Sequence, residues 1–515
     1  MICVSIGRTR HKMMLIEIEE AGKQGAELIE LRLDFLTRAV DLKRLLEVKP
    51  CPYVATIRRQ QDGGRWGRPE PERMMLLRQI IASGKFEWVD LESDIADKIP
   101  RFGATKRIVS YHNLKEMPKD LEDLHARMQD QDADVVKIAV RVEHPKDNLR
   151  VLRLSRIARK PTIALGMGDM GIPSRILAGK YGAPFSYAAF NKERGLAPGI
   201  LSFAEMKHTY HYDRLSFTTD VYAVIGDPIA QSLSPVAHNA AFRKLDMDAI
   251  YVPIRVPKSD LAETLDAFST IPVKGYSVTI PHKEAVLELA QEKEDLAERT
   301  RAANTLLWDD DGERFAAFNT DCDAALEALR ELMRELDIGS SFTGRTVLLL
   351  GAGGAARGVA YGLHREGALV IVASRTYDKG LRMAEDIGCR AVDWNARNSV
   401  NAEIVINCTP IGMYPQIDEM PVHVSALKPG LMVMDMVYNP ETTMLVRQAR
   451  ERGCKVATGV EMFVRQAARQ FQLFTSQEPP LEEMRQAVKR VLSPITVKYD
   501  DEPPPAEEPE PERGE

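Results

Sequence analysis

Eight short apolar runs, rich in β-branched residues, recur through the first 212 residues at intervals of very roughly 25 residues. They are Ile2–Ile6, Leu28–Phe35, Tyr53–Ile57, Trp88–Leu91, Arg107–Tyr111, Val135–Val140, Thr162–Leu165 and Phe185–Phe190. Amphipathic stretches such as Arg73–Ser83 and Asn148–Ala158 separate them. Open sheets also alternate strands with helices, but eight strands in one such unit favour closure. We therefore predict a (β/α)8 barrel over residues 1–212.

The rest of the chain predicts two further α/β units and a tail. A second unit begins near Thr218 and is expected to span 218–336, with a helical segment at 460–492 completing it. A third unit, over 337–459, opens with an apolar strand and a glycine-rich turn. Residues 498–515 are rich in Glu and Pro and carry too little apolar surface to fold, so we expect them to be disordered.

Composition excludes several classes of protein. No apolar run of about 18 residues is present and no signal-peptide pattern opens the chain, so we expect a cytoplasmic protein without a membrane partner. The six cysteines lie far apart, which argues against disulfides and against a metal site. The net charge is −6, and residues 500–515 hold eight acids and one arginine, or −7. The remainder is near +1, so no nucleic-acid partner is indicated.

A glycine-rich turn in the third unit predicts a dinucleotide site. The strand Val347–Leu350 leads into Gly-x-Gly-x-x-Ala at 351–356, where glycines let the backbone approach a pyrophosphate and a helix start presents free amides. The next strand ends in Ser-Arg-Thr at 374–376, where an NAD enzyme carries an acidic residue. A guanidinium between two hydroxyls suits the 2′-phosphate of NADP, so we predict NADPH as the cofactor. The alternative is that Arg375 is only a surface residue.

Four clusters of small polar residues precede this turn, each at the end of an apolar run. They lie at 232–235, 277–283, 303–305 and 319–321. Any one of them alone is explained as a helix cap or a turn. Four in one unit beside a dinucleotide fold predict a cleft that holds a hydroxylated, anionic substrate by hydrogen bonds.

From about Val221 to Val491 the chain resembles the shikimate dehydrogenases. The shared motifs are GDPI at 226–229, SLSP at 232–235, TIPHK at 279–283, NTD at 319–321, NCTPIGM at 407–413 and GVEM at 459–462. The resemblance implies that Lys283 and Asp321 form a catalytic pair beside the reacting oxygen. An ammonium there can stabilise a developing alkoxide and supply its proton. A surface ion pair is the alternative.

The same resemblance implies contacts to substrate and cofactor. Ser232 and Ser234 would bind the substrate carboxylate. The other implied substrate contacts are Thr279, Asn304, Tyr438 and Gln466. The implied cofactor contacts are Gly351, Gly353, Gly354, Ala355, Ala356, Ser374, Arg375, Thr376, Thr409, Met413 and Gly459.

A lysine interrupts one of the apolar runs in the first unit. Lys137 lies inside Val135–Val140, and lysine is seldom buried in an apolar strand without a function. Desolvation favours its neutral amine, which can attack a ketone. His112, predicted just after the fifth strand, could move protons, because the active site of a barrel lies at the carboxyl ends of its strands. The alternative is a lysine that extends to the rim of the barrel.

From about Ile2 to Tyr210 the chain resembles the type I 3-dehydroquinate dehydratases. The shared motifs are ELRLD at 30–34, TIR at 56–58, GG at 63–64, SYH at 110–112, KIA at 137–139, SR at 174–175 and APG at 197–199. The resemblance implies that Lys137 forms an imine with the C3 carbonyl and that His112 is the acid and base. Arg175 would pair with the substrate carboxylate. The other implied substrate contacts are Glu30, Arg32, Arg58 and Asp62.

Three positions depart from the dehydratase pattern. Asp62 replaces a glutamate, which is a conservative change. In the loop around the APG motif, Leu196 and Ile200 stand where the family has serine and glutamine that bind the substrate. We therefore expect weaker substrate binding with the covalent chemistry retained.

The product of the first reaction, 3-dehydroshikimate, is the ketone reduced in the second. The whole chain thus resembles the fused 3-dehydroquinate dehydratase/shikimate dehydrogenases, which implies small-molecule partners and leaves the oligomeric state open. One alternative is a shikimate dehydrogenase with a weakened barrel, for which Leu196 and Ile200 argue. The other is a non-catalytic metabolite sensor, against which the retained lysines, histidine and aspartate argue.

Overall fold

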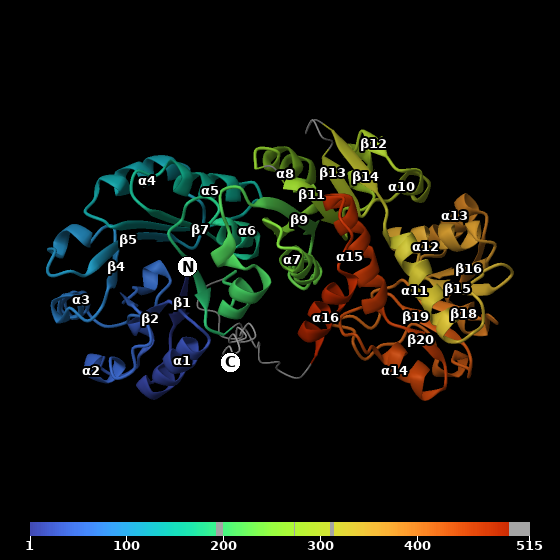
Figure 1. Ribbon diagram of the computed structural model, residues 1–515, viewed down its shortest axis with the longest axis horizontal. Helices are drawn as coiled ribbons and strands as arrows, with labels where there is room; N and C mark the ends of the chain where they lie inside the picture. Colours follow the sequence, from blue (N-terminus) through green and yellow to red (C-terminus); the bar gives the residue numbers. More distant parts are fainter. Residues whose placement is uncertain (192–198, 272, 309–313, 494–515) are drawn as a thin grey trace, which may run out of the picture.

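The computed structural model describes residues 1–191, 199–271, 273–308 and 314–493. Three sheets follow one another along the chain, one of eight strands and two of six. Figure 1 shows the three units in a row, and the last helices, in red, return to the middle unit. The predicted disordered tail lies outside the described residues.

The first unit is the predicted eight-stranded parallel sheet, curved into a near-barrel whose two end strands have no recorded pairing with each other among the described residues. Its strands lie in the order β7-β6-β5-β4-β3-β2-β1-β8, and every recorded pairing is parallel. The strands are β1 (Ile2–Ile6), β2 (Leu28–Arg32), β3 (Tyr53–Thr56), β4 (Trp88–Glu92), β5 (Lys106–Asn113), β6 (Val135–Arg141), β7 (Thr162–Met167) and β8 (Ser186–Ala189). The helices around them are α1 (His11–Lys23), α2 (Leu42–Leu45), α3 (Glu70–Ser83), α4 (Leu121–Asp130), α5 (Asp147–Ile157) and α6 (Ile172–Leu177). All eight strands coincide with the apolar runs.

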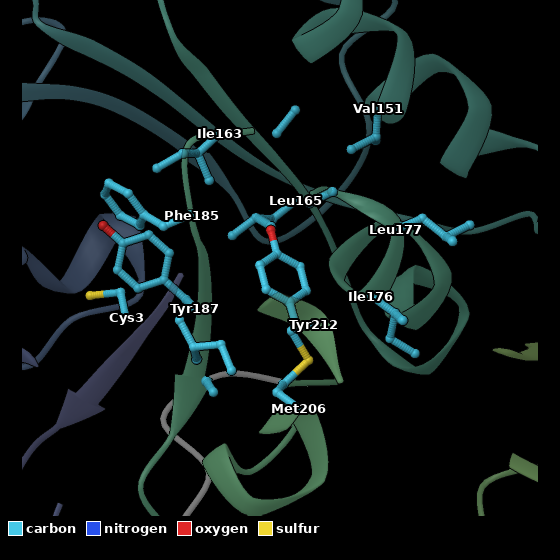
Figure 2. Close-up of a cluster of buried hydrophobic side chains, with 14 of the residues drawn as sticks. Cys3, Val151, Ile163, Leu165, Ile176, Leu177, Phe185, Tyr187, Met206 and Tyr212 are labelled. Carbon is cyan, nitrogen blue, oxygen red and sulfur yellow. The ribbon is translucent and has the colours of Figure 1, made fainter. Parts of the chain in front are cut away.

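Apolar side chains fill the barrel beside β7 and β8. Figure 2 shows Ile163 and Leu165 of β7 near Tyr187 of β8, with Cys3 of β1 close by. All four are buried, and Tyr212, from the segment after the barrel, is buried in the same cluster. The barrel interior is therefore a packed core that leaves one end for chemistry.

The middle unit is a mixed sheet in the order β10-β9-β11-β13-β14-β12. Its strands are β9 (Asp220–Gly226), β10 (Ala249–Arg255), β11 (Val273–Val278), β12 (Glu292–Lys293), β13 (Thr305–Trp308) and β14 (Phe315–Phe318). β9, β10 and β11 run parallel, and β13 is antiparallel to both β11 and β14. The helices that follow its strands are α7 (Ser234–Lys244), α8 (Leu261–Phe268), α9 (Ala285–Leu289) and α10 (Asp295–Thr300).

The predicted C-terminal helical segment is two helices, α15 (Gly459–Thr475) and α16 (Leu481–Leu492). α15 ends because Ser476 takes the left-handed conformation (φ 55°) and two prolines follow it. Phe471 of α15 and Met484 of α16 share one buried cluster with Phe242 of α7. These two helices thus pack on the middle unit.

The third unit is a parallel sheet in the order β17-β16-β15-β18-β19-β20. Its strands are β15 (Thr346–Leu350), β16 (Leu369–Ser374), β17 (Arg390–Asp393), β18 (Ile404–Asn407), β19 (Met432–Asp435) and β20 (Lys455–Ala457). Its helices are α12 (Gly354–Arg365), α13 (Tyr377–Ile387) and α14 (Met444–Glu451), and α11 (Asp321–Glu335), which precedes this unit in the chain, packs on it. This strand order is that of a Rossmann fold, whose ligands bind where the order reverses, between β15 and β18.

Glycines on one face of α12 bring the third unit against α11. A Cβ on Gly362 would lie 2.3 Å from Cys322 Sγ, and one on Gly358 would lie 3.5 Å from Asn319 Nδ2. At the start of the same face, a Cβ on Gly354 would lie 3.7 Å from Lys283 Cβ. The glycine-rich turn therefore abuts the lysine that the sequence placed in the substrate cleft.

Ion pairs join the barrel to the middle unit. His144 Nδ1 lies 2.8 Å from Asp260 Oδ2, and Arg255 Nη1 lies 3.6 Å from Asp169 Oδ2.

Among the described residues, no helix has the length and apolar character needed to cross a membrane.

Candidate active sites

Lys137 lies inside the barrel, and the side chains around it are more polar than the apolar residues of its own strand would predict. Its Nζ lies 3.1 Å from Asp90 Oδ2 and 3.7 Å from Glu30 Oε1. The same Nζ lies 3.7 Å from the centre of the Tyr187 ring. Alternate residues of a strand share one face, so β2, β4 and β6 each direct polar side chains into the barrel. The lysine is only 5% exposed, and two carboxylates balance its charge.

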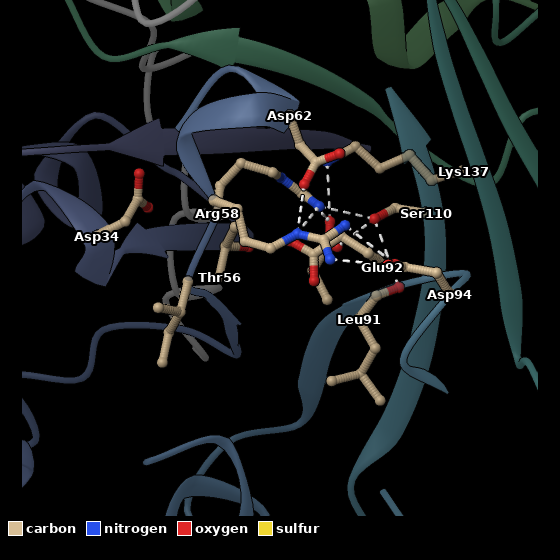
Figure 3. A network of polar contacts seen from close by, with 12 residues as sticks. Asp34, Thr56, Arg58, Asp62, Leu91, Glu92, Asp94, Ser110 and Lys137 are labelled. Atoms are coloured by element: carbon tan, nitrogen blue, oxygen red, sulfur yellow. Dashed lines mark hydrogen bonds and ion pairs between the residues drawn. The ribbon is translucent and has the colours of Figure 1, made fainter. Parts of the chain in front are cut away.

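Arg58 joins this group from the opposite side. Its Nη2 lies 2.7 Å from Asp90 Oδ2, and its Nη1 donates to Ser110 Oγ at 2.8 Å (Figure 3). Nη1 also lies 3.2 Å from Glu92 Oε1. Burial alone would raise the pKa of Asp90, but Arg58 and Lys137 outweigh burial and hold that pKa well below its usual range. The carboxylate is therefore a fixed negative charge beside the lysine.

Glu30 and Arg32 are each held by neighbouring side chains. Ser5 Oγ donates to Glu30 Oε2 at 2.6 Å, and Thr56 Oγ1 donates to Glu30 Oε1 at 2.8 Å. Arg32 donates from Nε and Nη2 to the two oxygens of Asp34, at 3.0 and 2.9 Å. Both side chains are buried, so the site is held in place before any substrate enters.

His112 lies within β5, which runs to Asn113, and not after the strand as the sequence predicted. It stands two residues beyond Ser110, whose register partner is Lys137, so it is on the lysine's face of the sheet. Among the described residues its buried Nδ1 has no hydrogen-bond partner. Burial, together with Arg58 and Lys137, holds the pKa of His112 well below its ordinary value. A neutral imidazole of this kind can accept a proton.

Arg175 presents a buried positive charge from α6. It is 3% exposed, and its Nε donates to Gly166 O at 2.8 Å. No carboxylate within the described ranges pairs with it, and burial lowers its pKa to about 10. Such a guanidinium suits an anionic ligand.

The structure does not join Asp62 to the lysine group. Asp62 accepts from Arg59 Nε at 2.6 Å, in the short turn after β3. Leu196 lies outside the described residues, and Ile200 is partly buried. Gly199 has a φ of 72°, and a Cβ there would lie 2.3 Å from Gly168 O, so Gly199 packs tightly on the turn after β7.

Four members of the barrel group were missed by the sequence analysis, namely Asp90, Glu92, Ser110 and Tyr187. The two acids were detectable, because the strand Trp-Val-Asp-Leu-Glu alternates apolar with acidic residues, which directs both acids to one face. Tyr187 gave no signal, since a tyrosine in an apolar strand is ordinary core composition.

The second group centres on Lys283 and Asp321. Lys283 Nζ pairs with Asp321 Oδ2, and Asn304 Nδ2 donates to Asp321 Oδ1 at 2.9 Å. Asp321 is the first residue of α11, where the helix dipole favours a carboxylate. Lys283 O accepts from Ala303 N at 2.8 Å, which holds the lysine segment beside Asn304.

Asn304 ties three parts of the chain together. Its Nδ2 also donates to Thr320 Oγ1 at 2.9 Å and to Gln466 Oε1 of α15 at 3.4 Å. Gln470, one helical turn further along α15, donates from Nε2 to Asn304 O at 2.8 Å and accepts from Ser277 Oγ at 2.8 Å. Gln470 was not among the residues predicted from the sequence.

The remaining predicted substrate residues lie in other segments of the C-terminal half. Ser232 Oγ accepts from Ser234 N at 3.3 Å at the start of α7. Thr279 follows β11, and its N–H donates to Ile225 O at 3.0 Å. Tyr438 packs on Phe463 with ring centres 4.7 Å apart. In the described ranges, no hydrogen bond joins these four hydroxyl-bearing residues to Lys283 or Asp321.

The residues at the start of α12 fit a phosphorylated dinucleotide. Gly351 has a φ of 111°, which favours glycine, and a Cβ on Gly353 would meet nothing within 4 Å. Open backbone at a helix start is what a pyrophosphate needs. Arg375 follows β16 and is exposed, and no acid in the described part of the chain pairs with it. A free guanidinium at this strand end fits the 2′-phosphate of NADP.

The other predicted cofactor residues lie along the same edge of the sheet. Ala355 and the buried Ala356 belong to the first turn of α12, and Ser374 and Thr376 flank Arg375. Thr409 and Met413 lie in the loop after β18, and Gly459 begins α15. A Cβ on Gly459 would lie 2.3 Å from Val437 O, so only glycine lets this helix start so close to the Tyr438 segment.

Fold and sites together define a class of protein. A barrel with a buried lysine beside a neutral histidine is the arrangement of a Schiff-base lyase. A Rossmann unit whose phosphate turn abuts a lysine–aspartate pair is that of an NADP-dependent oxidoreductase. The chain therefore combines a lyase with a dehydrogenase.

Comparisons with known protein families give the same division. Residues 2–216 match the type I 3-dehydroquinase model, and residues 224–306 match the shikimate dehydrogenase substrate-binding domain. Residues 346–437 match an NADP oxidoreductase model described as coenzyme F420-dependent, and residues 459–489 match the shikimate 5′-dehydrogenase C-terminal domain.

A relative from Arabidopsis thaliana, the chloroplastic bifunctional 3-dehydroquinate dehydratase/shikimate dehydrogenase, is 35% identical over 94% of this chain and 83% of its own length. The NADP⁺ shikimate dehydrogenase of Methanothermobacter thermautotrophicus is 38% identical over 53% of this chain and 98% of its own length. A shikimate dehydrogenase structure in complex with NADP⁺ matches with a TM-score of 0.51 and 31% identity, over 54% of this chain and 98% of that one. This chain belongs to the bifunctional 3-dehydroquinate dehydratase/shikimate dehydrogenase family.

Proposed function

We propose that this chain dehydrates 3-dehydroquinate to 3-dehydroshikimate in its barrel and reduces that product to shikimate with NADPH in its C-terminal half. The observation that carries the proposal is the presence of two separate lysine centres on one chain. Lys137 lies beside a neutral His112, and Lys283 is paired with Asp321 beside the start of α12. Each centre has the residue types that its reaction needs.

In the dehydration, the ammonium of Lys137 first gives a proton to His112, and the resulting neutral amine attacks the substrate's C3 carbonyl. His112 returns the proton as water leaves and the iminium forms. The iminium withdraws electrons and acidifies the proton at C2. His112 removes that proton, the C1–oxygen bond breaks with its electron pair, and His112 returns the proton so that water departs. Hydrolysis of the imine releases the product and regenerates the lysine. Arg175 holds the substrate carboxylate.

Asp90 and Glu30 suit both charged states of Lys137 in this cycle, the ammonium and the iminium. They stabilise the ammonium of the free enzyme, at 3.1 and 3.7 Å from its Nζ, and they can stabilise the iminium that replaces it. Glu30, Arg32 and Arg58 also contact substrate hydroxyls in this proposal. Asp62 is a weaker candidate, because its carboxylate already pairs with Arg59.

In the reduction, NADPH bound at the start of α12 would supply a hydride for the ketone carbon. The ammonium of Lys283 lies beside the carbonyl oxygen and donates a proton as the alkoxide forms, while Asp321 orients that ammonium. Ser232 and Ser234 bind the substrate carboxylate. Thr279, Asn304, Tyr438 and Gln466 hold the ring hydroxyls. Gly351, Gly353 and the first turn of α12 bind the pyrophosphate, and Arg375 binds the 2′-phosphate.

A second candidate is a dehydrogenase whose barrel has lost much of its dehydratase activity. It is favoured by Ile200, an apolar residue where the family carries an amide that binds substrate. The intact group around Lys137 argues for retained chemistry, so we propose a catalytic barrel with weak substrate binding. We also propose the domain boundaries predicted above and a cytoplasmic location, and the Arabidopsis relative is described as chloroplastic.

Borohydride trapping tests the proposal directly. Treating the enzyme with borohydride in the presence of 3-dehydroquinate should reduce the imine and leave a stable adduct on Lys137, located by peptide mass spectrometry. The Lys137→Ala variant is the control and should acquire no adduct. Active enzyme in which Lys137 stays unmodified would rule the mechanism out.

A further inference from the structure

Asp435 is a buried carboxylate at the carboxyl end of β19, outside every group described so far. Its side chain is 0% exposed, and in the described part of the chain no lysine or arginine pairs with it. Burial raises its pKa to about 6. A carboxylate is costly to bury without a cation, so its three hydrogen bonds need an explanation.

Those hydrogen bonds come from three different segments. Asn407 Nδ2, at the end of β18, donates to Oδ1 at 2.9 Å. Val437 N, in the segment after β19, donates to the same oxygen at 3.0 Å. Thr443 Oγ1, which caps α14, donates to Oδ2 at 2.6 Å. One side chain therefore joins two loops and a helix start.

The bond to Asn407 orients the cofactor loop. A carboxylate only accepts hydrogen bonds, so it selects the orientation in which Asn407 presents its NH₂ group. The amide oxygen then faces Thr409 and accepts from its N–H at 3.0 Å and from its Oγ1 at 2.7 Å. Asn407 Nδ2 also donates to Ile411 O at 3.1 Å. Thr409 and Met413, the predicted cofactor contacts of this loop, therefore depend on the amide orientation that Asp435 imposes.

The bond to Val437 holds the segment that carries Tyr438. The backbone N–H accepted by Asp435 belongs to the residue just before that tyrosine. On the other side, α15 fixes the same segment, because Gly459 packs against Val437 O and Phe463 packs on the Tyr438 ring. Asp435 thus restrains the predicted substrate tyrosine through its backbone.

We propose that Asp435 is a positioning residue for the reductase, whose carboxylate holds the cofactor loop at 407–413 and the Tyr438 segment in one fixed relation. The inference rests on the proposed reductase function and extends it to a residue that contacts neither substrate nor cofactor. Hydride transfer needs the two bound molecules aligned, and a shared anchor for the loops that contact them supplies that alignment.

Asp435→Ala tests this directly. It should raise the KM for NADPH and the KM for 3-dehydroshikimate by about tenfold each and lower kcat, because both loops lose their anchor. Asp435→Asn should recover most of the loss, since its amide oxygen can still accept from Asn407 and Val437 and its NH₂ can donate to Thr443. Asn407→Ala should raise the KM for NADPH far more than that for 3-dehydroshikimate. Dehydratase activity on the same chain should be unchanged.

Thr443→Val is the matched control for lost stability. It removes the α14 cap and one partner of the carboxylate, so it should lower the melting temperature, but the bonds to Asn407 and Val437 remain and both KM values should stay within about twofold. The dissociation constant for NADPH, measured by its fluorescence, gives a readout apart from activity. The inference would be overturned if the KM values of Asp435→Ala and Thr443→Val rose only in proportion to their loss of melting temperature. It would also be overturned if Asp435→Ala bound NADPH as tightly as the wild type. A wild-type chain that binds NADPH but reduces no 3-dehydroshikimate would instead refute the proposed function.

Discussion

The two lysine centres are assembled in different ways. In the barrel, Lys137 and its partner Asp90 lie 47 residues apart, on nearby strands of one sheet, and charged side chains surround both. In the reductase, Asn304 meets Gln466 across 162 residues, and the groups around Lys283 and Asp321 are mainly neutral amides and hydroxyls. The barrel centre is complete once the barrel unit itself folds, because its residues lie on the sheet, just after β3 and on α6. The reductase centre also requires the last helices to return to the middle unit.

The difference in charge reflects the difference in chemistry. A lysine that cycles between ammonium and iminium keeps its positive charge, so carboxylates that stay ionised suit both states. A lysine that gives up a proton during each turnover needs one carboxylate to orient it. Further negative charge beside it would stabilise the ammonium and oppose the proton transfer. The two sites should therefore respond independently to mutation.

Removing each lysine in turn tests most strongly whether the two centres act independently. Lys137→Ala should lower dehydratase activity by more than about 10⁴-fold, because the covalent route is lost. Lys283→Ala should lower reduction of 3-dehydroshikimate by roughly 10²- to 10⁴-fold. Each variant should keep the other activity within about twofold, because Lys137 lies on β6 of the barrel and Lys283 follows β11 of the middle unit, so neither side chain belongs to the other centre. Steady-state assays of both steps on both variants check this, and parallel loss of both activities would show that the centres are coupled.

Cofactor selectivity belongs to the reductase alone. Arg375→Ala should weaken NADPH binding by about 1.5–3 kcal/mol, the range for hydrogen bonds to charged groups, and should change NADH binding little. Comparing the two dissociation constants measures the effect, with Arg382 on the exposed face of α13 as a matched control for loss of a surface charge. Equal losses for both cofactors would mean that Arg375 supports the fold and does not bind the phosphate.

A smaller effect is expected at the altered barrel loop. Restoring the family pattern with Leu196→Ser and Ile200→Gln should lower the KM for 3-dehydroquinate about tenfold with less change in kcat, because new hydrogen bonds reach the substrate while Lys137 and His112 are untouched. Steady-state kinetics and the melting temperature are measured on the same double variant. A lower melting temperature without a gain in KM would show that both side chains pack against the barrel and that the family's roles do not transfer.

The smallest effect concerns pH. His112 must be neutral to remove a proton, and its pKa is lowered from the ordinary value of 6.5, so the neutral form is lost only as pH falls through that lowered value. The acid limb of dehydratase kcat/KM should therefore lie below pH 6.5. A limb at or above the ordinary histidine value would show that positive charge from Arg58 and Lys137 does not act on His112 as inferred.

Much of the fold follows from the order of apolar runs. The eight barrel strands and the strand–turn–helix of the Rossmann unit were located because each is a local pattern. The C-terminal helical segment was located without its division into two helices, since that break depends on the left-handed turn at Ser476. His112 was placed after its strand because β5 continues through polar residues that resemble a loop.

The partners of the site residues were harder to predict. Asp90 lies in an acidic–apolar alternation that could have been recognised, but nothing local shows that it meets Lys137. Asp435 ends an apolar strand as an ordinary turn residue would, and only the adjacency of β18 and β19 reveals its bond to Asn407. Contacts between strands depend on sheet order, which a single sequence states only indirectly.

The most direct test of two consecutive centres on one chain is a coupled assay. The purified protein is given 3-dehydroquinate and NADPH as its only substrates, and the loss of NADPH absorbance is followed. The account predicts that NADPH is oxidised one for one with 3-dehydroquinate, that Lys137→Ala abolishes this, and that added 3-dehydroshikimate restores it. Wild-type protein that oxidises NADPH only when 3-dehydroshikimate is supplied would contradict the account and assign the barrel no dehydratase role.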